Sequence, residues 1–209
     1  MRFIIICAGM NDFTELYNYQ ENDYVITVDG GYKYAKMKNI IPNVHLGDDD
    51  SFIDENNLSA KDNILKYNPI KDESDLELAV NYIINNYKNT QNEILIYNAT
   101  GNRLDHFFAA VRLLYKYSNL NMKIINKTNE MFIINDSYTF YKDNHKYISF
   151  FNYVNNTIIS LKGFKYNLEN YKMKKYDNLC LSNEIDNNFN NNCANVTVNK
   201  PILCIKSSD

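Results

Sequence analysis

Residues 93–117, "EILIYNATGNRLDHFFAAVRLLYKY", decide the class of fold, because they join an apolar strand to an amphipathic helix through a short polar turn. The first five residues form an apolar run that is typical of a buried strand. From Arg103 onward, apolar residues recur at helical spacing, and the face they form consists of Leu104, Phe107, Phe108, Val111, Leu114 and Tyr115. A strand followed by such a helix predicts one unit of a parallel sheet that is covered by helices.

The same alternation extends outward from this stretch to the N-terminus and ends near residue 127. Helix-like segments separate most of the strand-like runs, which lie at 3–7, 24–28, 44–47, 63–67 and 122–126. The clearest other helix covers residues 74–88, with one apolar face made of Leu76, Ala79, Val80, Ile83, Ile84 and Tyr87. We therefore expect residues 1–127 to form an α/β domain around a parallel sheet.

Beyond residue 127 the helical pattern stops, and short apolar runs follow one another across Asn-rich turns. These runs lie at 131–135, 138–141, 147–151, 157–161, 179–182, 194–198 and 202–206. Short strands separated only by turns are typical of an antiparallel sandwich. The sequence thus predicts a second domain, an antiparallel β-sandwich over residues 128–209.

Composition excludes several classes of protein. The net charge of -3 and the scattered lysines argue against nucleic acid as a partner. The apolar run near the N-terminus is too short for a signal peptide or a membrane span, so we expect no membrane association and a cytoplasmic protein. The four cysteines have no C-x-x-C spacing, which favours reduced core residues.

Residues of the kinds found in binding and catalytic sites follow four of the predicted strands. In an open parallel sheet, ligands bind beyond the carboxyl ends of the strands, so these side chains should converge on one edge. In chain order the four groups are Asp29 with Gly30 and Gly31, then Asp48, Asp49 and Asp50, then Lys71, Asp72 and Asp75, and last Thr100, Gly101, Arg103, Asp105 and His106.

The stretch "HLGDDDSF", residues 45–52, crowds three carboxylates into one turn. Adjacent carboxylates raise one another's pKa unless a cation offsets them, so the stretch predicts a cation site. Alternate residues at a strand end point into one crevice, which makes Asp48 and Asp50 the natural pair and leaves Asp49 facing elsewhere. Hard oxygen ligands favour Mg²⁺, which commonly bridges protein carboxylates and substrate phosphates. A phosphoryl-type transfer is therefore the leading class of reaction.

Neither common ATP cradle is present, because the chain has no G-x-x-x-x-G-K-[ST] loop and no kinase glycine-rich loop. The candidates for holding phosphates are Arg103, Lys71 and the backbone amides of residues 100–102 at a helix N-terminus. Several of the polar residues also have a purely structural interpretation. Ser74 and Glu77 have the spacing of a capping box, and Arg103 with Asp105 fits a surface ion pair at the start of a helix. For His106 we favour a structural role.

Five stretches carry a resemblance to a known family. They are "VDGGYKYA" (28–35), "IPNVHLGDDDSF" (41–52), "IKDESDLELA" (70–79), "ATGNRLDHFFAAV" (99–111), and "GFKYNL" (163–168) with "LSNE" (181–184). In order and spacing the chain resembles the thiamine pyrophosphokinase family. The resemblance implies a homodimer with active sites between subunits. It also implies transfer of a diphosphoryl group from ATP to the hydroxyethyl group of thiamine, giving AMP and thiamine diphosphate with Mg²⁺.

Matched to the family's motifs, individual residues acquire expected roles. Asp48, Asp50 and Asp75 are expected at the metal and the phosphates. Asp72 matches the first aspartate of the family's D-x-[ST]-D motif, and Arg103 and Asp105 match its R-x-D pair. The residues expected at thiamine are Tyr166, Ser182 and Asn183. The chain departs from the usual pattern at Asn43, Asn102 and Ala110, none of which is an expected ligand.

The mechanism that follows is in-line attack by the thiamine hydroxyl on the β-phosphorus of ATP. Catalysis would then rest on positioning and on charge neutralisation, with Arg103 or Lys71 offsetting charge on the leaving AMP. Asp72 or Asp105 is the candidate proton acceptor. Two alternatives remain open, namely another Mg²⁺-dependent phosphoryl or nucleotidyl transferase and a non-catalytic protein that binds thiamine or a nucleotide.

Overall fold

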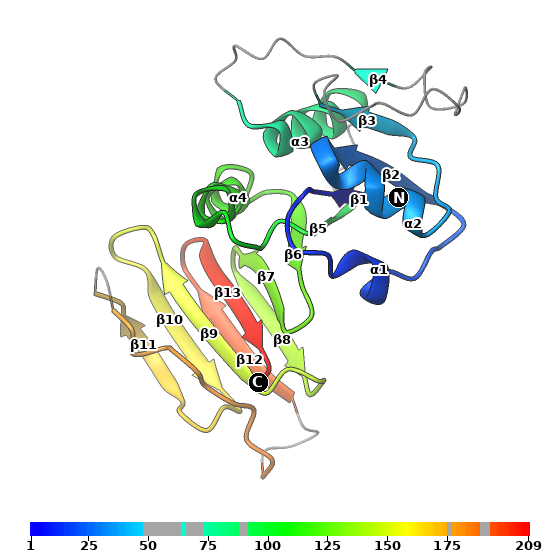
Figure 1. Cartoon of the computed structure of the whole chain (residues 1–209). Helices are drawn as coiled ribbons and strands as arrows, with labels where there is room; N and C mark the ends of the chain where they lie inside the picture. The colour runs from blue at the N-terminus through cyan, green and yellow to red at the C-terminus, as the bar shows by residue number, and fades with distance from the viewer. Residues whose placement is uncertain (48–63, 66–72, 88–91, 175–176, 189–192) are drawn as a thin grey trace. The chain divides into compact units, whose positions relative to one another are not determined.

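The computed structural model describes residues 1–47, 64–65, 73–87, 92–174, 177–188 and 193–209. The chain divides into two compact units (Figure 1). The first comprises Met1–Leu113 with Leu120–Lys127, and the second comprises Leu114–Asn119 with Thr128–Asp209. The predicted fold class, an α/β part with a parallel sheet followed by an antiparallel β-sandwich, is confirmed.

The first unit is built on parallel strands in the spatial order β4-β3-β2-β1-β5-β6. Their bounds are β1 Arg2–Ile6, β2 Asp23–Val28, β3 Val44–Leu46, β4 Ile64–Leu65, β5 Glu93–Tyr97 and β6 Asn121–Ile125. In the central strand β1, the side chains from Phe3 to Ile6 are all 0% exposed. Burial on both faces explains why this strand is a continuous apolar run rather than an alternating one.

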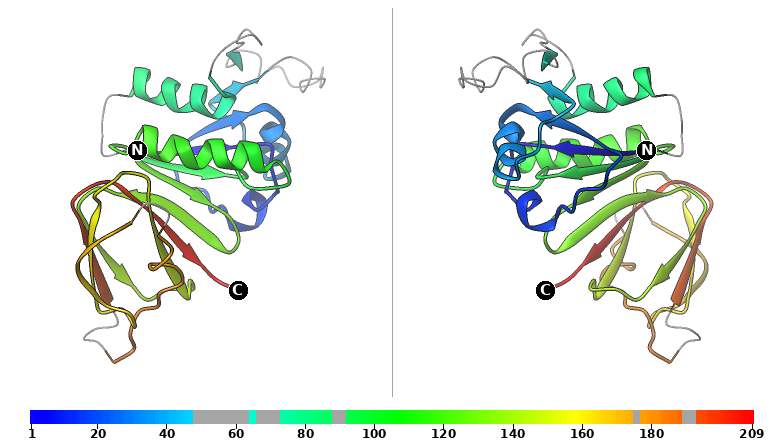
Figure 2. Two further views of the ribbon diagram at one scale, coloured as in Figure 1. Left: turned by 90° about the vertical axis from the view of Figure 1, so that its left-hand side faces the viewer. Right: turned by 90° about the vertical axis from the view of Figure 1, so that its right-hand side faces the viewer.

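Helices cover both faces of this sheet (Figure 2). They are α1 Phe13–Leu16, η1 Asp29–Gly31, α2 Tyr32–Met37, α3 Asp75–Asn86 and α4 Leu104–Lys116. On one face, Phe13 of α1 and Ala35 of α2 belong to the core cluster that contains Ile4 of β1. On the other face, the rings of Tyr24 on β2 and Tyr82 on α3 stack at 6.5 Å. Because successive side chains of a strand point to opposite faces of a sheet, the same strands can pack against helices on both sides.

The apolar face of α4 is only partly buried. Val111 and Leu114 are 5% and 1% exposed, as predicted, whereas Leu104 and Phe108 are 72% and 55% exposed. The apolar face predicted from helical spacing is therefore buried along only part of its length. Helical spacing identifies which residues share a face, but it does not determine how far along the helix the core extends. Ala110 and Leu113, on the neighbouring line of the helix, are buried as well.

The second unit consists of antiparallel strands. Their bounds are β7 Asn129–Ile134, β8 Ser137–Tyr141, β9 Tyr147–Asn152, β10 Ile158–Lys162, β11 Leu168–Lys172, β12 Cys193–Val198 and β13 Ile202–Ser207. β13 pairs with β7 and β9, and the other strands form a sheet in the order β11-β10-β12-β8. Phe140, Phe150 and Phe164 pack edge to face in the core, with centroids 5.8 to 5.9 Å apart.

Two details of this unit differ from the expectation. Residues 179–182, expected as a strand, form turns and bends, and the residue that follows them forms an isolated bridge with β9, between Ile148 and Asn183. β11 was not predicted, because its residues are mostly polar and only Leu168 and Tyr171 pack against the core. All four cysteines are free; Cys7, Cys180 and Cys204 are buried, as expected, whereas Cys193 is only partly buried. Within the described ranges, no helix is both long and apolar enough to cross a membrane.

Candidate active site

A tight turn follows β2 at Asp29, Gly30 and Gly31. Asp29 adopts φ 48°, in the left-handed region that few residues other than glycine occupy. A Cβ atom on Gly31 would lie 2.0 Å from the carbonyl oxygen of Ile6 on the adjacent strand. The glycine is therefore required for close contact between two backbones. This packing fixes the position of Asp29 at the carboxyl end of β2.

The loops after β1 and β5 are joined to each other through their backbones. Gly9 N donates to Asn98 O at 2.9 Å, and Met10 N donates to Thr100 O at 2.8 Å. A Cβ on Gly9 would lie 2.3 Å from both carbonyl oxygens. The buried Asn98 side chain completes the junction, because its Oδ1 accepts from the amides of Asp12 and Phe13 at the start of α1.

This junction presents Thr100 and Gly101, both half-buried, at the carboxyl edge of the sheet. Gly101 adopts φ 154°, which favours glycine. Only Asn102 and Arg103 separate these two residues from α4, so the predicted group at the end of β5 is close to a helix N-terminus, where anions are favoured.

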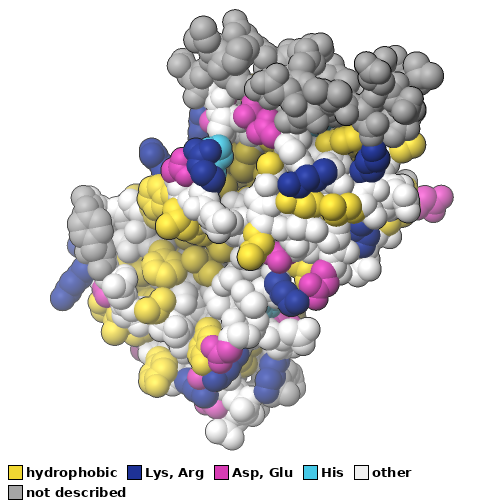
Figure 3. Space-filling view, viewed as in Figure 1, with side chains coloured by type: hydrophobic (Ala, Val, Ile, Leu, Met, Phe, Trp, Pro, Cys, Tyr) yellow, Lys and Arg dark blue, Asp and Glu magenta, His cyan; other side chains and the backbone are white. Residues whose placement is uncertain are grey.

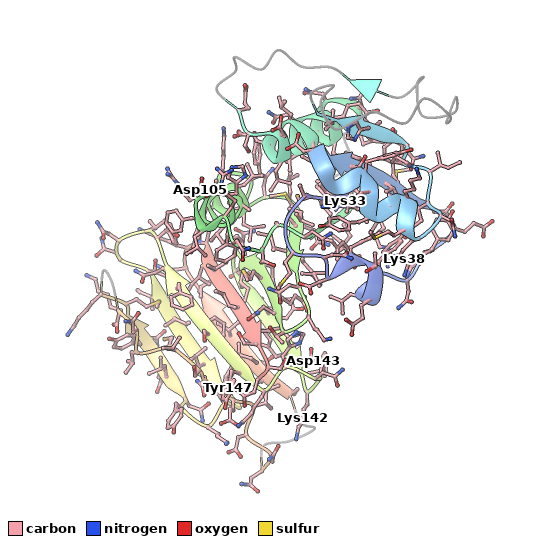
Figure 4. All side chains as sticks on the ribbon, in the orientation of Figure 1. Lys33, Lys38, Asp105, Lys142, Asp143 and Tyr147 are labelled. Atoms are coloured by element: carbon pink, nitrogen blue, oxygen red, sulfur yellow. The ribbon has the colours of Figure 1, made fainter. Side chains whose placement is uncertain are left out.

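Arg103 and Asp105 form a bidentate ion pair at the start of α4. Arg103 Nε lies 3.0 Å from Asp105 Oδ1, and a terminal guanidinium nitrogen lies 2.6 Å from Oδ2. The pair lowers the pKa of Asp105, but both side chains are about two-thirds exposed, so solvent screens the attraction. Figure 4 shows Asp105 on α4. His106 is exposed too, and its Nε2 lies 4.0 Å from Asp105 Oδ2.

The predicted acidic residues are only partly covered by the structure. Asp75 is the first residue of α3, where the capping interpretation of Ser74 is confirmed, because Ser74 Oγ accepts from Glu77 N at 3.2 Å. Asp48, Asp50, Lys71 and Asp72 lie outside the described residues. Among the residues that are described, no group of three or more His, Cys, Asp or Glu side chains is arranged to hold a metal ion.

A buried polar pair precedes the acidic stretch. His45 on β3 is 2% exposed, and its Nδ1 lies 2.9 Å from Oγ1 of Thr27, its register partner on β2. Burial lowers the pKa of His45 to about 4, so the ring is neutral at pH 7. A Cβ on Gly47 would lie 3.2 Å from Asp29 Oδ1 and 3.3 Å from His45 Nε2. Glycine at position 47 therefore leaves room for both side chains where the acidic stretch begins.

In the second unit, the structure brings the predicted residues Tyr166, Ser182 and Asn183 together. Asn183 Oδ1 accepts from Tyr166 N at 3.1 Å, and its Nδ2 donates to Tyr166 O at 2.7 Å. The buried amide of Asn183 thus holds the backbone of Tyr166, whose ring is 71% exposed. Ser182, the residue before Asn183, is exposed and adopts φ 54°.

The chain resembles known proteins over most of its length. Residues 16–126 match the family model of the thiamin pyrophosphokinase catalytic domain, and residues 137–203 match that of the thiamin pyrophosphokinase vitamin B1 binding domain. A thiamine pyrophosphokinase of Bacillus subtilis is 34% identical over 197 residues, which cover 88% of this chain and 90% of that protein. The chain belongs to the thiamine pyrophosphokinase family.

Solved structures of thiamine pyrophosphokinases have the same fold. The Bacillus subtilis structure superposes with a TM-score of 0.83 and 28% identity, covering 100% of both chains. The structure from Geobacillus thermodenitrificans gives 0.84 and 26% identity, covering 100% of this chain and 98% of that one. The prediction that the chain is an enzyme of the thiamine pyrophosphokinase family is confirmed.

The matched family domains contain the predicted residues and also some that sequence reasoning missed. Asp29, Asp75, Arg103 and Asp105 lie within the stretch matched to the catalytic domain, and Tyr166, Ser182 and Asn183 within the stretch matched to the vitamin B1 binding domain. Of the residues that sequence reasoning missed, His45, Asn98 and Ser149 lie within these stretches, and Gly9 precedes them. The signal for His45 was a polar residue inside the apolar run "VHLG"; the signal for Ser149 was likewise a polar residue inside "YISFF".

Proposed function

We propose that this chain transfers a diphosphoryl group from ATP to the hydroxyl group of thiamine, giving thiamine diphosphate and AMP. The observation that carries the proposal is the pair of family matches, one to a catalytic domain and one to a vitamin B1 binding domain, in their order along a single chain. The predicted residues at the carboxyl edge of the parallel sheet are of the kind that ATP and Mg²⁺ require.

We assign binding of the ATP phosphates to the amides of the Thr100–Gly101 turn and to the side chains of Arg103 and Lys71. The phosphates would then lie at the carboxyl edge of the sheet, where Asp29 is located. What supports this is the junction between the loops after β1 and β5, which fixes the turn before α4. Backbone amides at a helix N-terminus bind anions without requiring a lysine-containing loop. The ion pair with Asp105 engages Nε and one terminal nitrogen of Arg103, so the other terminal nitrogen can donate to phosphate oxygens while the pair persists.

Mg²⁺ is assigned to Asp48, Asp50 and Asp75. The donor set fits the ion, because all three offer carboxylate oxygens and Asp75 stands in the first turn of α3. When bound, Mg²⁺ supplies positive charge next to the phosphate oxygens. Without the ion, Asp48 and Asp50, two positions apart in the sequence, repel each other, which is the reason to expect that these residues bind a cation.

Asp72 is assigned as the acceptor of the proton from the thiamine hydroxyl. Sequence reasoning left Asp72 and Asp105 as alternatives. The ion pair with Arg103 lowers the pKa of Asp105, so while the pair persists this carboxylate is a weaker base than an ordinary aspartate. Asp72 then accepts the proton while the oxygen attacks the β-phosphorus in line with the leaving AMP, and Arg103 or Lys71 offsets the charge on AMP.

Thiamine is assigned to Tyr166, Ser182 and Asn183. The exposed ring of Tyr166 offers a face to the cationic thiazolium, and the exposed Ser182 offers a hydroxyl group. Asn183 contributes by holding Tyr166, since both polar atoms of its amide are bound to the Tyr166 backbone.

We further assign nucleotide and metal binding to residues 1–127, and thiamine binding and dimerisation to residues 128–209 of a cytoplasmic homodimer with active sites between subunits. The exposure of Leu104 and Phe108 on α4 supports an additional protein contact. On the face seen in Figure 3, basic and acidic side chains are interspersed, which agrees with small-molecule substrates rather than nucleic acid.

The test is to incubate the protein with ATP, Mg²⁺ and thiamine and to separate the products by chromatography. We expect AMP and thiamine diphosphate in equal amounts. ADP with thiamine monophosphate, or a nucleotidyl adduct, would assign the chain to another class of transferase. Binding of thiamine without any product would make it a non-catalytic binding protein.

A further inference from the structure

Residues 180–186 lie between two other segments of the second unit and are hydrogen-bonded to both. On one side, Asn183 exchanges two backbone hydrogen bonds with Ile148 of β9, at 2.8 and 3.0 Å. On the other side, Lys165 N donates to Glu184 O at 2.8 Å, and Asp186 N donates to Gly163 O at 3.0 Å. The segment that carries Ser182 therefore connects β9 to the stretch that carries Tyr166.

Within this segment, Ser182 has a backbone conformation that serine rarely adopts. Its φ is 54°, in the left-handed region, which is unfavourable for a residue with a Cβ atom. Such a conformation persists only where neighbouring groups impose it. Ser182 N donates to Ser149 Oγ at 2.9 Å, so the hydroxyl of Ser149 binds the backbone of the strained residue itself.

Ser149 is an unusual residue for its position. It lies in β9 opposite Ile205 of β13 and is 6% exposed, between Ile148 and Phe150, which are 2% and 1% exposed. Packing alone would favour an apolar side chain here, because a buried hydroxyl is unfavourable unless it is hydrogen-bonded. The bond to Ser182 N explains why a hydroxyl group is present at this point of the strand.

We propose that Ser149 is a positioning residue for thiamine: its hydroxyl holds Ser182 in the left-handed conformation and so presents the Ser182 side chain in one orientation beside Tyr166. This inference rests on the proposed function, because it takes Ser182 and Tyr166 as thiamine contacts. Ser149 itself does not touch the substrate. Two polar groups thus fix the two contacts, Ser149 through the backbone of Ser182 and Asn183 through the backbone of Tyr166.

The experiment compares Ser149→Ala with the matched control Thr157→Val. Thr157 is 0% exposed, and its hydroxyl donates to Val154 O at 2.7 Å, so the control also removes one buried hydroxyl from the same unit. We expect Ser149→Ala to raise the KM for thiamine about 10-fold, as for the loss of one hydrogen bond, with the KM for ATP unchanged. Thr157→Val should leave both KM values unchanged.

Direct binding provides a second measurement. The chain contains no tryptophan, so Tyr166→Trp introduces a single fluorophore at the assigned thiamine contact. Titration with thiamine should give an affinity about 10-fold weaker when Ser149→Ala is added. In the Ser182→Gly background, Ser149→Ala should change the affinity little, because glycine adopts the left-handed conformation without support. If Ser149→Ala alone fails to fold, the inference is still tested by comparing Ser182→Gly with and without Ser149→Ala.

Three results would overturn the inference: equal thiamine affinity with and without Ser149→Ala, equal increases in the KM for thiamine and for ATP, or an undiminished effect of Ser149→Ala in the Ser182→Gly background. Failure of the proposed function looks different. It would appear as an absence of thiamine turnover and binding in the chain with the native Ser149, and it would overturn the inference as well.

Discussion

The buried histidine on β3 makes the stability of the fold depend on pH in a predictable way. His45 packs beside Thr27 and against the ring of Tyr32, and burial lowers its pKa from 6.5 to about 4. In the unfolded chain the ring keeps its ordinary pKa. As the pH falls below about 6.5, the unfolded state therefore binds a proton that the folded state does not bind, and the free energy of unfolding decreases.

The size of the effect follows from the two pKa values. They differ by about 2.5 pH units, and each unit corresponds to about 1.4 kcal/mol, so the loss of stability attributable to His45 approaches 3 kcal/mol at pH 4. Stability is fully present above the unfolded pKa and decreases through the range from about 6.5 to about 4. Below that range both states are protonated and the contribution of His45 becomes constant.

Urea unfolding of the wild type and of His45→Gln between pH 7 and pH 4 tests this prediction. Glutamine keeps an acceptor for the Thr27 hydroxyl but does not titrate. The wild type should lose about 3 kcal/mol more than His45→Gln over this range. His106→Gln, which changes an exposed histidine, is the matched control and should follow the wild-type curve. If the curves for the wild type and His45→Gln are parallel, the ring is not held neutral by burial and the reasoning is refuted.

Three further predictions concern the two units. Asp48→Asn and Asp50→Asn should abolish turnover while Asp49→Asn keeps most of it; equal activity of all three in a product assay would remove the metal assignment. Tyr166→Ala should raise the KM for thiamine about 3-fold to 30-fold and leave that for ATP unchanged, with Tyr166→Phe nearly silent; equal changes in both KM values would remove Tyr166 from the thiamine site. Gly31→Ala should lower the free energy of unfolding by about 3 kcal/mol, because its Cβ would lie 2.0 Å from Ile6 O, whereas Gly30→Ala meets Ala8 Cβ at an ordinary 3.4 Å; equal melting temperatures for the two would contradict the close packing.

Much of the fold was predictable, because local signals agreed with the tertiary structure. The helix α3 begins at Asp75 after the Ser74 cap and ends at Asn86, within two residues of the expected bounds. The strands of the first unit are continuous apolar runs because the sheet is buried on both faces. The exposure of Leu104 and Phe108 was not predictable, since helical spacing contains no information about where the core ends.

The candidate site was predictable in residue type and only partly in role. Tyr166, Ser182 and Asn183 were grouped by resemblance, but the use of the Asn183 amide to hold Tyr166 follows only from tertiary hydrogen bonds. The turn at 179–182 was mistaken for a strand because Leu179, Cys180 and Leu181 form a short apolar run there. Its left-handed Ser182 depends on Ser149, a residue 33 positions earlier in the chain, and no local pattern contains that partner.

The fate of the β-phosphoryl group of ATP tests the central claim most directly. The protein is incubated with Mg²⁺, thiamine and ATP that carries an isotopic label only in the β-phosphoryl group, and the labelled products are separated. Diphosphoryl transfer predicts that the label leaves the nucleotide completely, so that it appears in thiamine diphosphate and the AMP is unlabelled. Label retained in ADP, or released as free pyrophosphate, would contradict the account.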